Sequence, residues 1–345
     1  MLTSLVILLN QLQWNNSSMA DKLKNIVVIG GGTGTFTVLS GLKKYPHNLT
    51  AIVSMADDGG STGRLRDELG VLPPGDIRQC LVALSEADLS LRKLFNYRFE
   101  SGNLKGYSFG NLFISAFEKI TGDINKALID ISNVLKIKGK VLPVTLDKVQ
   151  LKAKLENGVE LNGENEINNS WLLSKFGIKK LFLNPRPKAN PKAIQSILDA
   201  DIIIIGPGNI YCSIVPNFLI RGIPEAIKKS KAIKIYNCNL MTKHGHTDRF
   251  SVYDFVNVIE QYLGSRIFDY ITFNAKKPSS ALLTKYSSEG EWVEFNKKIS
   301  DDKRFVGADL VSSIFYCQNP ADELKRTLIR HDSDKLAKTI ISLLK

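Results

Sequence analysis

Short apolar runs rich in β-branched residues alternate along the chain with longer segments whose apolar residues recur at helical spacing. The run 26–29 ends in glycines, a segment with helical spacing follows at 35–44, and a second apolar run covers 50–54. Because a buried parallel strand is apolar on both faces, this order predicts a β-α-β unit that is complete by about residue 55.

The same alternation resumes at Pro191 and continues toward the end of the chain. Further strands are predicted at 202–205, 233–236 and 270–273. The predicted helices span residues 76–99, 111–120, 123–136, 191–200, 213–220, 223–229, 251–263, 323–330 and 333–344. Strands that alternate with helices predict an α/β fold of the Rossmann type, with a mostly parallel sheet and helices on both of its faces.

Residues 140–185 interrupt this pattern. Positions 149–155 alternate strictly between apolar and polar, a turn containing Gly158 follows, and the alternation returns at 159–161. Such a pattern is typical of a β-hairpin. We therefore expect a single Rossmann-like domain over 21–345 that carries a small β-rich insert at about 140–185.

The first twenty residues differ from the rest of the chain. Their apolar segment 5–9 is too short to cross a membrane, and no Lys or Arg precedes it as a secretory signal requires. From Met19 the chain leads directly into the first predicted strand. We expect 1–20 to be a loose leader, or Met19 rather than Met1 to be the native start. The sequence holds no run of about 18 apolar residues, so no membrane span is predicted.

The charge balance is basic, with 46 Lys and Arg against 34 Asp and Glu among 345 residues and a formal net charge of +12. Such a balance can indicate nucleic-acid binding. Here the lysines are dispersed, often as pairs such as Lys43-Lys44, and no block of five like charges occurs. This pattern favours a solvated basic surface over a nucleic-acid interface, and we expect no nucleic-acid partner.

The cysteines and histidines of the sequence suggest no metal or disulfide framework. The four cysteines are Cys80, Cys212, Cys238 and Cys317. Their wide spacing excludes a C-x-x-C pair, and their apolar surroundings favour reduced thiols in a cytoplasmic protein. His244 and His246 are the one close histidine pair, but the sequence supplies no third ligand near them, so we do not expect them to bind metal.

Glycines and threonines follow the first predicted strand and open the first predicted helix. Glycine lets a backbone approach a phosphate closely, and a helix N-terminus presents free N–H groups to an anion. The P-loop lysine and the last glycine of a dinucleotide fingerprint are both missing. We predict a phosphate-bearing ligand here, with a tight turn as the alternative. The candidate residues are Gly31, Gly32, Thr33 and Gly34.

A second polar loop begins where the second strand ends. Asp57 and Asp58 follow the strand directly, and Arg64 lies in the same glycine-rich segment. One carboxylate would suffice for a ribose, whereas two followed by an arginine favour Mg²⁺ beside a phosphate that the arginine clamps. A solvent-facing Asp-Gly turn is the alternative. Asp76 and Arg78 open the next helix. They either cap this helix or contribute to the ligand site at the same edge, where Asp76 would add a carboxylate and Arg78 a phosphate contact.

Further candidate residues come from a helix start and from the loops after two later predicted strands, of which the first would face the first glycine loop across a crevice. They are Asn111, Gly208, Asn209, Asn239 and Thr242. Amide groups can read a base or a hydroxyl, so two loops across a crevice would hold the two ends of a nucleotide-type ligand. Structural turns, and a helix cap by Ser108 next to Asn111, are the alternatives. A G-x-S-x-G elbow is absent, so acyl hydrolysis is not expected.

The order of these motifs resembles the gluconeogenesis factor family of bacteria, which belongs to the superfamily of the 2-phospho-L-lactate transferases. The motifs are G-G-G-T-G at 30–34, A-D-D-G-G-S-T-G-R-L-R at 56–66, P-P-G-D-I-R at 73–78, S-F-G-N-L-F at 108–113, I-T-G-D at 120–123, G-P-G-N-I-Y at 206–211 and C-N-L-M-T at 238–242. The resemblance covers the chain from about residue 25 to the end. It departs at Lys243-His244-Gly245-His246, where the family usually has Gln-Pro-Gly-Glu, and at Asn274-Ala275, where Asn-Asn is more usual.

The resemblance implies a cytoplasmic regulatory protein that binds a nucleotide, a dinucleotide or a UDP-sugar such as UDP-N-acetylglucosamine. It further implies a link to cell shape, central carbon flow and the supply of cell-wall precursors, with a homo-oligomer or a cell-wall enzyme as conceivable partners. The transferase relatives instead use Mg²⁺ to move a phospholactyl group from a guanosine diphosphate carrier to a deazaflavin alcohol. Asp58 and Asp76 fall where that metal is expected, so a transferase of this type is the alternative function.

Overall fold

The computed structural model describes residues 23–295, 301–313 and 329–344. Its core is a seven-stranded sheet in the order β10-β9-β8-β7-β1-β2-β3, in which every neighbouring pair is parallel. The strands are β1 (Asn25–Gly30), β2 (Asn48–Val53), β3 (Lys140–Pro143), β7 (Ile202–Ile205), β8 (Ile233–Asn237), β9 (Tyr270–Asn274) and β10 (Phe305–Ala308). The expectation of a Rossmann-like α/β fold with a parallel sheet is confirmed.

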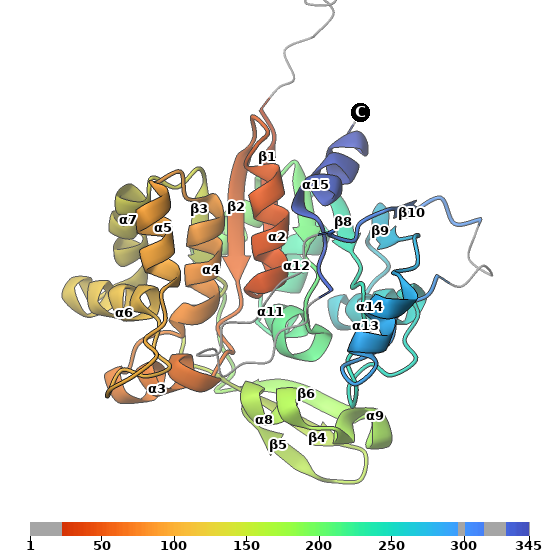
Figure 1. The fold of residues 1–345 in the computed structure, drawn as a ribbon, viewed down its shortest axis with the longest axis horizontal. Coiled ribbons are helices and arrows are strands. Elements are labelled where there is room, and N and C mark those ends of the chain that lie inside the picture. Colours follow the sequence, from red (N-terminus) through yellow and green to blue (C-terminus); the bar gives the residue numbers. More distant parts are fainter. Residues whose placement is uncertain (1–22, 296–300, 314–328, 345) are drawn as a thin grey trace, which may run out of the picture.

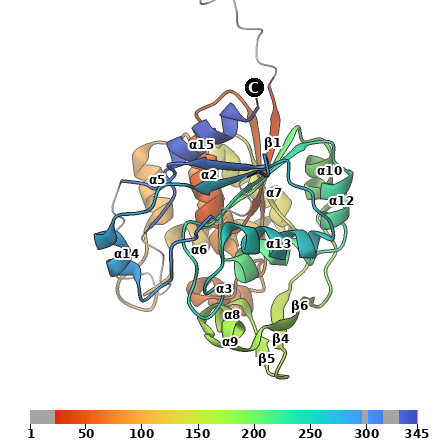
Figure 2. The ribbon, with the colours of Figure 1, turned by 90° about the vertical axis from the view of Figure 1, so that its right-hand side faces the viewer.

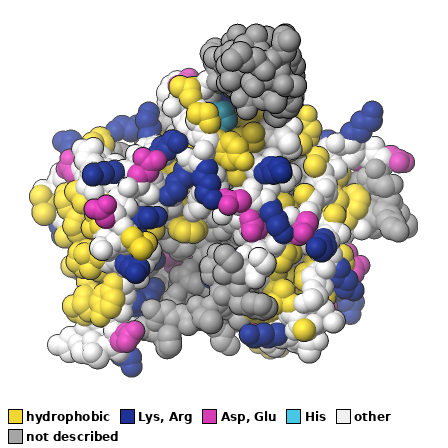
Figure 3. Space-filling model, turned by 45° about the horizontal axis from the view of Figure 1, so that its top comes forward, with side chains coloured by type: hydrophobic (Ala, Val, Ile, Leu, Met, Phe, Trp, Pro, Cys, Tyr) yellow, Lys and Arg dark blue, Asp and Glu magenta, His cyan; other side chains and the backbone are white. Residues whose placement is uncertain are grey.

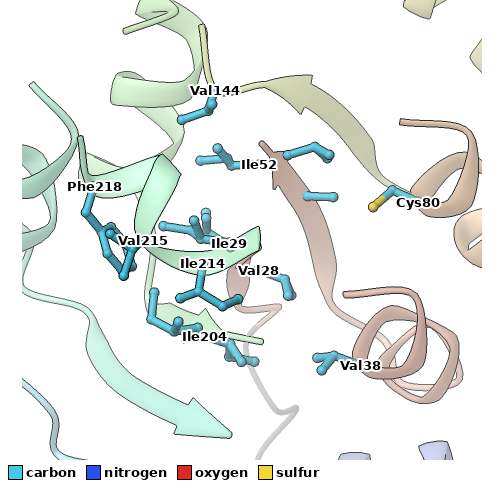
Figure 4. Close-up of a cluster of buried hydrophobic side chains, with 14 of the residues drawn as sticks. Val28, Ile29, Val38, Ile52, Cys80, Val144, Ile204, Ile214, Val215 and Phe218 are labelled. Atoms are coloured by element: carbon cyan, nitrogen blue, oxygen red, sulfur yellow. The ribbon is translucent and has the colours of Figure 1, made fainter. Parts of the chain in front are cut away.

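The apolar runs of the sequence form the centre of this sheet. Strands β1 and β7 pair in register from Ile26 with Ile202 to Ile29 with Ile205, and all four residues of β7 are buried. Figure 4 shows their side chains packed between helices on both faces. Burial on both faces explains why these strands contain no polar alternation.

Helices cover both faces of the sheet (Figures 1 and 2). On one face α2 (Thr33–Leu42) lies between α4 (Pro74–Leu84) and α15 (Ser333–Ser342), whereas α10 (Pro191–Leu198) and α12 (Ile223–Lys229) lie on the other. Besides two short helices within residues 164–176, the remaining helices of the described residues are α3 (Gly60–Leu69), α5 (Leu89–Asn96), α6 (Phe109–Thr121), α7 (Ile124–Leu135), α11 (Val215–Phe218), α13 (Val252–Leu263), α14 (Ser280–Tyr286) and the π-helix η1 (Ile210–Ile214).

The structure differs from the sequence-based expectation in segments 76–99 and 60–69. The helix predicted over 76–99 is interrupted after α4, because Ser85 has an extended backbone and its hydroxyl donates to the carbonyl of Leu135. The segment 60–69, which the sequence presents as a glycine-rich loop, is the helix α3. Most of the helix predicted at 323–330 lies outside the described residues, as do the expectations for 1–20 and Met19.

A separate three-stranded antiparallel sheet lies below the carboxyl edge of the main sheet in Figure 1. It has the order β5-β4-β6 and carries two short helices. Its elements are β4 (Gln150–Leu155), β5 (Glu160–Asn162), α8 (Glu164–Asn169), α9 (Leu172–Phe176) and β6 (Ile178–Asn184). Residues 140–143, which the sequence pattern groups with the insert, are strand β3 of the main sheet. We call residues 150–184 the small sheet.

Charged side chains are dispersed over the surface. On the face seen in Figure 3, Lys and Arg are interspersed with Asp and Glu and form no continuous stripe. Within the described residues, no helix is both long and apolar enough to cross a membrane. Cys80, Cys212 and Cys238 are buried free thiols.

Candidate functional site

A cavity of about 1010 Å³ opens at the carboxyl edge of the main sheet. The strand order reverses between the paired strands β1 and β7, because β2 and β3 follow on the side of β1 whereas β8, β9 and β10 follow on the side of β7. Ligands of open α/β sheets bind at such a switch point. The loops that follow the two strands, Gly31–Gly34 and Pro207–Asn209, both line the cavity. The fold therefore brings the two glycine loops of the sequence together.

The first glycine loop leads into the N-terminus of α2. This helix begins at Thr33, its N-cap Gly32 has no side chain to cap it, and no acidic residue lies in its first turn. The first N–H groups of such a helix have no partner within the helix and carry its positive dipole end. The Thr33 hydroxyl donates to Gln79 Oε1 at 3.0 Å, which ties the loop to α4. The loop has the local features of a phosphate site.

Carboxylates face this loop from two neighbouring segments. A Cβ atom on Gly32 would lie 2.3 Å from Asp76 Oδ1, so the Asp76 carboxylate lies directly against the loop. Asp57 also lines the cavity and accepts the N–H of Gly59 at 3.0 Å. Both stand where Mg²⁺ bound to a phosphate would find oxygen ligands.

Glu164, the first residue of α8, adds a third carboxyl group to the cavity lining. Burial raises the pKa of Glu164 well above its usual value, and the nearby charges of Asp57, Asp58 and Asp76 raise it further. This crowding of like charges is what a bound cation would offset.

The carboxylates fit a Mg²⁺ ion that the protein would share with a bound phosphate. The described residues contain no preformed cluster of three or more Asp, Glu, His or Cys ligands. Mg²⁺ typically takes one or two protein carboxylates and fills its remaining positions with water and substrate phosphate. Asp57 and Asp76 would hold the ion in this way.

Asp58 contacts the small sheet. Its two carboxylate oxygens accept the backbone N–H groups of Glu164 at 3.1 Å and Asn165 at 2.7 Å, and Arg66 lies 3.8 Å away. Asp58 is not among the residues that line the cavity. Its oxygens therefore tie the loop after β2 to the start of α8, and the binding of a ligand or a metal by Asp58 stays a prediction.

The two arginines expected to contact phosphate are both engaged by the protein. The guanidinium of Arg64 lies over the ring of Tyr107, 4.9 Å from its centroid, outside the cavity lining. Arg78 does line the cavity, but it is buried and its Nε donates to Asn111 Oδ1 at 3.0 Å. Arg78 therefore orients Asn111, and the phosphate contacts of both arginines stay predictions.

Asn111 occupies the first turn of α6, where its backbone N–H donates to the Ser108 hydroxyl at 3.2 Å. The capping interaction weighed from the sequence is thus present. Its side-chain amide nitrogen also donates to Thr62 Oγ1 at 3.4 Å. Asn111 also lines the cavity, so the helix cap by Ser108 and a place for Asn111 in the cavity wall are both present.

The other wall of the cavity is built from the loops after β7 and β8. Asn239 makes two hydrogen bonds with Gly208, accepting its N–H at 3.2 Å and donating to its carbonyl at 2.8 Å. The Asn209 side chain accepts the N–H groups of Tyr211 and Cys212 and so begins η1. These bonds make the second glycine loop rigid.

Thr242 lines the same wall, and its hydroxyl accepts the N–H of Glu291 at 2.8 Å. In all, the structure gathers around one cavity the predicted residues Gly31, Gly32, Thr33, Gly34, Asp57, Asp76, Arg78, Asn111, Gly208, Asn209, Asn239 and Thr242. Their binding of a ligand stays a prediction.

Several lining residues escaped the sequence analysis because they come from the small sheet or lie against it. Glu164 follows Gly163 after a strand, a signal of the kind used elsewhere in the chain. Lys243 reaches across from the loop after β8, and its ammonium group donates to the Asn168 backbone and side chain. Burial lowers the pKa of Lys243. These contacts fasten the small sheet to the main sheet.

The histidine pair does not act as a unit. His244 is bonded to Asp248 at 2.7 Å through Nδ1 and to the Ser287 carbonyl at 2.9 Å through Nε2. His246 is buried, and burial together with the nearby Lys243 lowers its pKa to about 3. The two rings therefore lie in different environments, one hydrogen-bonded near the surface and the other buried.

Comparisons with known proteins agree with this architecture. The family model described as 2-phospho-L-lactate transferase CofD matches residues 26–311. A Clostridium acetobutylicum protein is 44% identical over 318 residues, which cover 92% of this chain and 68% of the relative. The gluconeogenesis factor of Bacillus subtilis is 40% identical, over 93% of this chain and 98% of that protein.

A solved structure shows the same fold. The crystal structure of a Bacillus halodurans protein superposes with a TM-score of 0.83 at 39% sequence identity. The match covers 93% of this chain and 100% of the other. The motifs that suggested the resemblance, the family match and the shared fold thus lead to one conclusion. The chain belongs to the 2-phospho-L-lactate transferase CofD family and, within it, to the gluconeogenesis factors.

Proposed function

We propose that this protein binds a nucleotide, and in the first place a UDP-sugar, in the cavity at the switch point of its sheet. The observation that carries the proposal is the meeting of two glycine loops at one cavity, with the N-terminus of α2 as an anion site. A volume of about 1010 Å³ is at the upper end of the usual range for ligand pockets. This size favours a nucleotide-sugar or a dinucleotide over a mononucleotide.

The physiological role follows from the ligand class. A UDP-sugar such as UDP-N-acetylglucosamine is a precursor of the cell wall, so a cytoplasmic protein that senses it would adjust precursor supply and cell shape. The family resemblance supports this regulatory reading and a cell-wall enzyme as the partner. The reading requires ligand binding and no turnover.

A second candidate is a Mg²⁺-dependent transferase of the 2-phospho-L-lactate type. It is supported by the description of the matching family model and by the two carboxylates, Asp57 and Asp76, that line the cavity. Bound Mg²⁺ would neutralise phosphate charge there. The chain's own contribution would be to hold the diphosphate between the two glycine loops and to keep the leaving phosphate oriented.

Calorimetric titration distinguishes the two candidates. UDP-N-acetylglucosamine, UDP-glucose, NAD⁺ and GDP are titrated with and without Mg²⁺. A UDP-sugar that binds more tightly than GDP, and is recovered unchanged, supports the sensor. Preference for GDP with an absolute Mg²⁺ requirement supports the transferase. Heat changes indistinguishable from dilution for all four ligands would overturn the proposed nucleotide binding.

A further inference from the structure

An exposed aromatic ring lines the cavity from the side of the small sheet. Trp171 lies between α8 and α9 in the chain and lines the cavity, and 64% of its surface is exposed. Among the described residues that line the cavity, it is the sole Phe, Tyr or Trp. The remaining lining is mostly glycine, amide, hydroxyl and charged groups. Any flat ring of a ligand therefore has one aromatic surface on which to stack.

The position of Trp171 is fixed by the loop after β8. A Cβ atom on Gly245 would lie 2.4 Å from Trp171 Cα, so the two backbones are in close contact. The N–H of Ser174 donates to the Gly245 carbonyl at 2.8 Å. On the other side the Ser170 hydroxyl accepts the N–H of Leu172 at 3.2 Å. The backbone that carries the ring is thus held in place before a ligand arrives, which lowers the entropic cost of binding.

The surroundings of the ring suit a polar heteroaromatic group. Asn168, Asn169 and Ser170 also line the cavity and precede the tryptophan directly. Lys175 places its ammonium group 5.3 Å from the ring centroid. A ring with hydrogen-bonding edges can stack on an indole and meet amide groups at its rim, whereas a phosphate uses no such aromatic surface.

We propose that Trp171 is the platform on which the base of the bound nucleotide stacks. The ligand would then extend from the glycine loops, which hold its phosphates, to the small sheet, which holds its base. This inference rests on the proposed nucleotide binding and adds to it the place of the base. Gly245 acts as a positioning residue, because it touches the tryptophan backbone and not the ring.

The test compares a nucleotide with a ligand that lacks a base. UDP, NAD⁺, GDP and inorganic pyrophosphate are titrated calorimetrically into the wild type, Trp171→Ala and Trp171→Phe. Trp171→Ala is expected to lower the affinity for the nucleotide by about five- to a hundredfold, the range for the loss of one base stack. The affinity for pyrophosphate is expected to stay unchanged. Trp171→Phe keeps an aromatic face and is expected to stay near the wild type. An equal loss for nucleotide and pyrophosphate, or no loss at all, overturns the inference.

Two further measurements separate stacking from folding. Nucleotide is expected to quench a tryptophan fluorescence signal that is missing in Trp171→Phe and kept in Trp292→Phe, because Trp292 does not line the cavity. Gly245→Ala is expected to weaken nucleotide more than pyrophosphate. If the wild type binds pyrophosphate and none of the nucleotides, the proposed function and this inference both fall. If it binds a nucleotide that Trp171→Ala binds equally well, this inference alone falls.

Discussion

Gly34 and Pro207 lie so close together that a Cβ atom on the glycine would stand 1.6 Å from the proline carbonyl oxygen. The two residues belong to the loops after β1 and β7, at the point where the strand order of the sheet reverses. A glycine at position 34 is therefore required by the contact between the two loops that form the cavity. The contact sets the width of the crevice at its base.

Gly34→Ala is expected to push the two loops apart. Because Pro207 meets the new methyl group with its backbone and not with a flexible side chain, the free energy of unfolding should fall by about 1–3 kcal/mol. Nucleotide affinity should fall as well. Urea unfolding and calorimetry measure the two effects. Gly206→Ala is the matched control, because its nearest contact would be an ordinary 3.5 Å. An alanine at 34 that is as well tolerated as one at 206 would contradict the contact.

Asp76→Asn is expected to remove the Mg²⁺ dependence of nucleotide binding, because the carboxylate lies against the glycine loop. Asp58→Asn serves as the comparison and should keep that dependence, since Asp58 binds the start of α8. Calorimetry with and without Mg²⁺ measures both variants. Loss of the Mg²⁺ effect in Asp58→Asn, with Asp76→Asn unaffected, would restore the metal ligand expected from the sequence.

Asp58→Ala is expected to loosen the small sheet. The substitution leaves the first N–H groups of α8 without their acceptor, and a lost helix cap costs about 0.5–2 kcal/mol. Hydrogen exchange should accelerate at Glu164 and Asn165, whereas the amides of β1 should keep their protection. Unchanged exchange in α8 would mean that this contact does not hold the small sheet in place.

Glu164→Gln is expected to stabilise the protein most at high pH. The folded pKa of Glu164 is raised above the usual 4.5, so the folded state holds its proton more tightly than the unfolded chain does. Stability from this group is full below pH 4.5 and is lost as the pH rises through the folded pKa. Glutamine cannot ionise and avoids that loss. A gain in melting temperature at pH 5 equal to that at pH 8 would argue against a raised pKa.

His246 is expected to destabilise the fold in acid. Its folded pKa of about 3 lies below the usual 6.5, so its stabilising contribution is present above pH 6.5 and is lost as the pH falls toward 3. His246→Gln should therefore lose less stability than the wild type between pH 7 and pH 4, measured by urea unfolding. His244→Gln is the control, because the bond to Asp248 raises the pKa of His244, so that the stability contributed by His244 is lost as the pH rises. Parallel curves for wild type and His246→Gln would contradict this account.

The central strands and the glycine loops could be predicted from the sequence because their signals are local. An apolar run followed by glycine marks both β1 and β7, and parallel strands bring their carboxyl ends to one edge. Helix α3 could not be predicted in the same way. Gly60 and Gly63 make it resemble a loop, since glycine is a poor helix former. A Cβ atom on Gly63 would lie 2.1 Å from the Asp58 carbonyl oxygen, so close packing explains that glycine.

The roles of Asp58 and Glu164 depend on contacts between distant segments. Asp57 and Asp58 are equivalent in sequence, and which of them faces the cavity is decided by the small sheet, more than a hundred residues away. Trp171 likewise reaches the cavity through that sheet. A local pattern contains no information about such a contact. The sequence could therefore locate the carboxylate pair, but it could not show that Asp57 and Asp58 have different contacts.

The pairing of β1 with β7 also determines when the ligand site can exist. Asn25 at the start of β1 donates its N–H to Asp201 at 2.8 Å, across a separation of 176 residues. Contacts between such distant positions form slowly, because the intervening chain must be ordered before they contribute stability. We therefore expect the two glycine loops to meet late in folding, after each half of the sheet has formed. Nucleotide binding during refolding would therefore report that the fold is complete. A chain in which only one half of the sheet has folded would not bind the nucleotide.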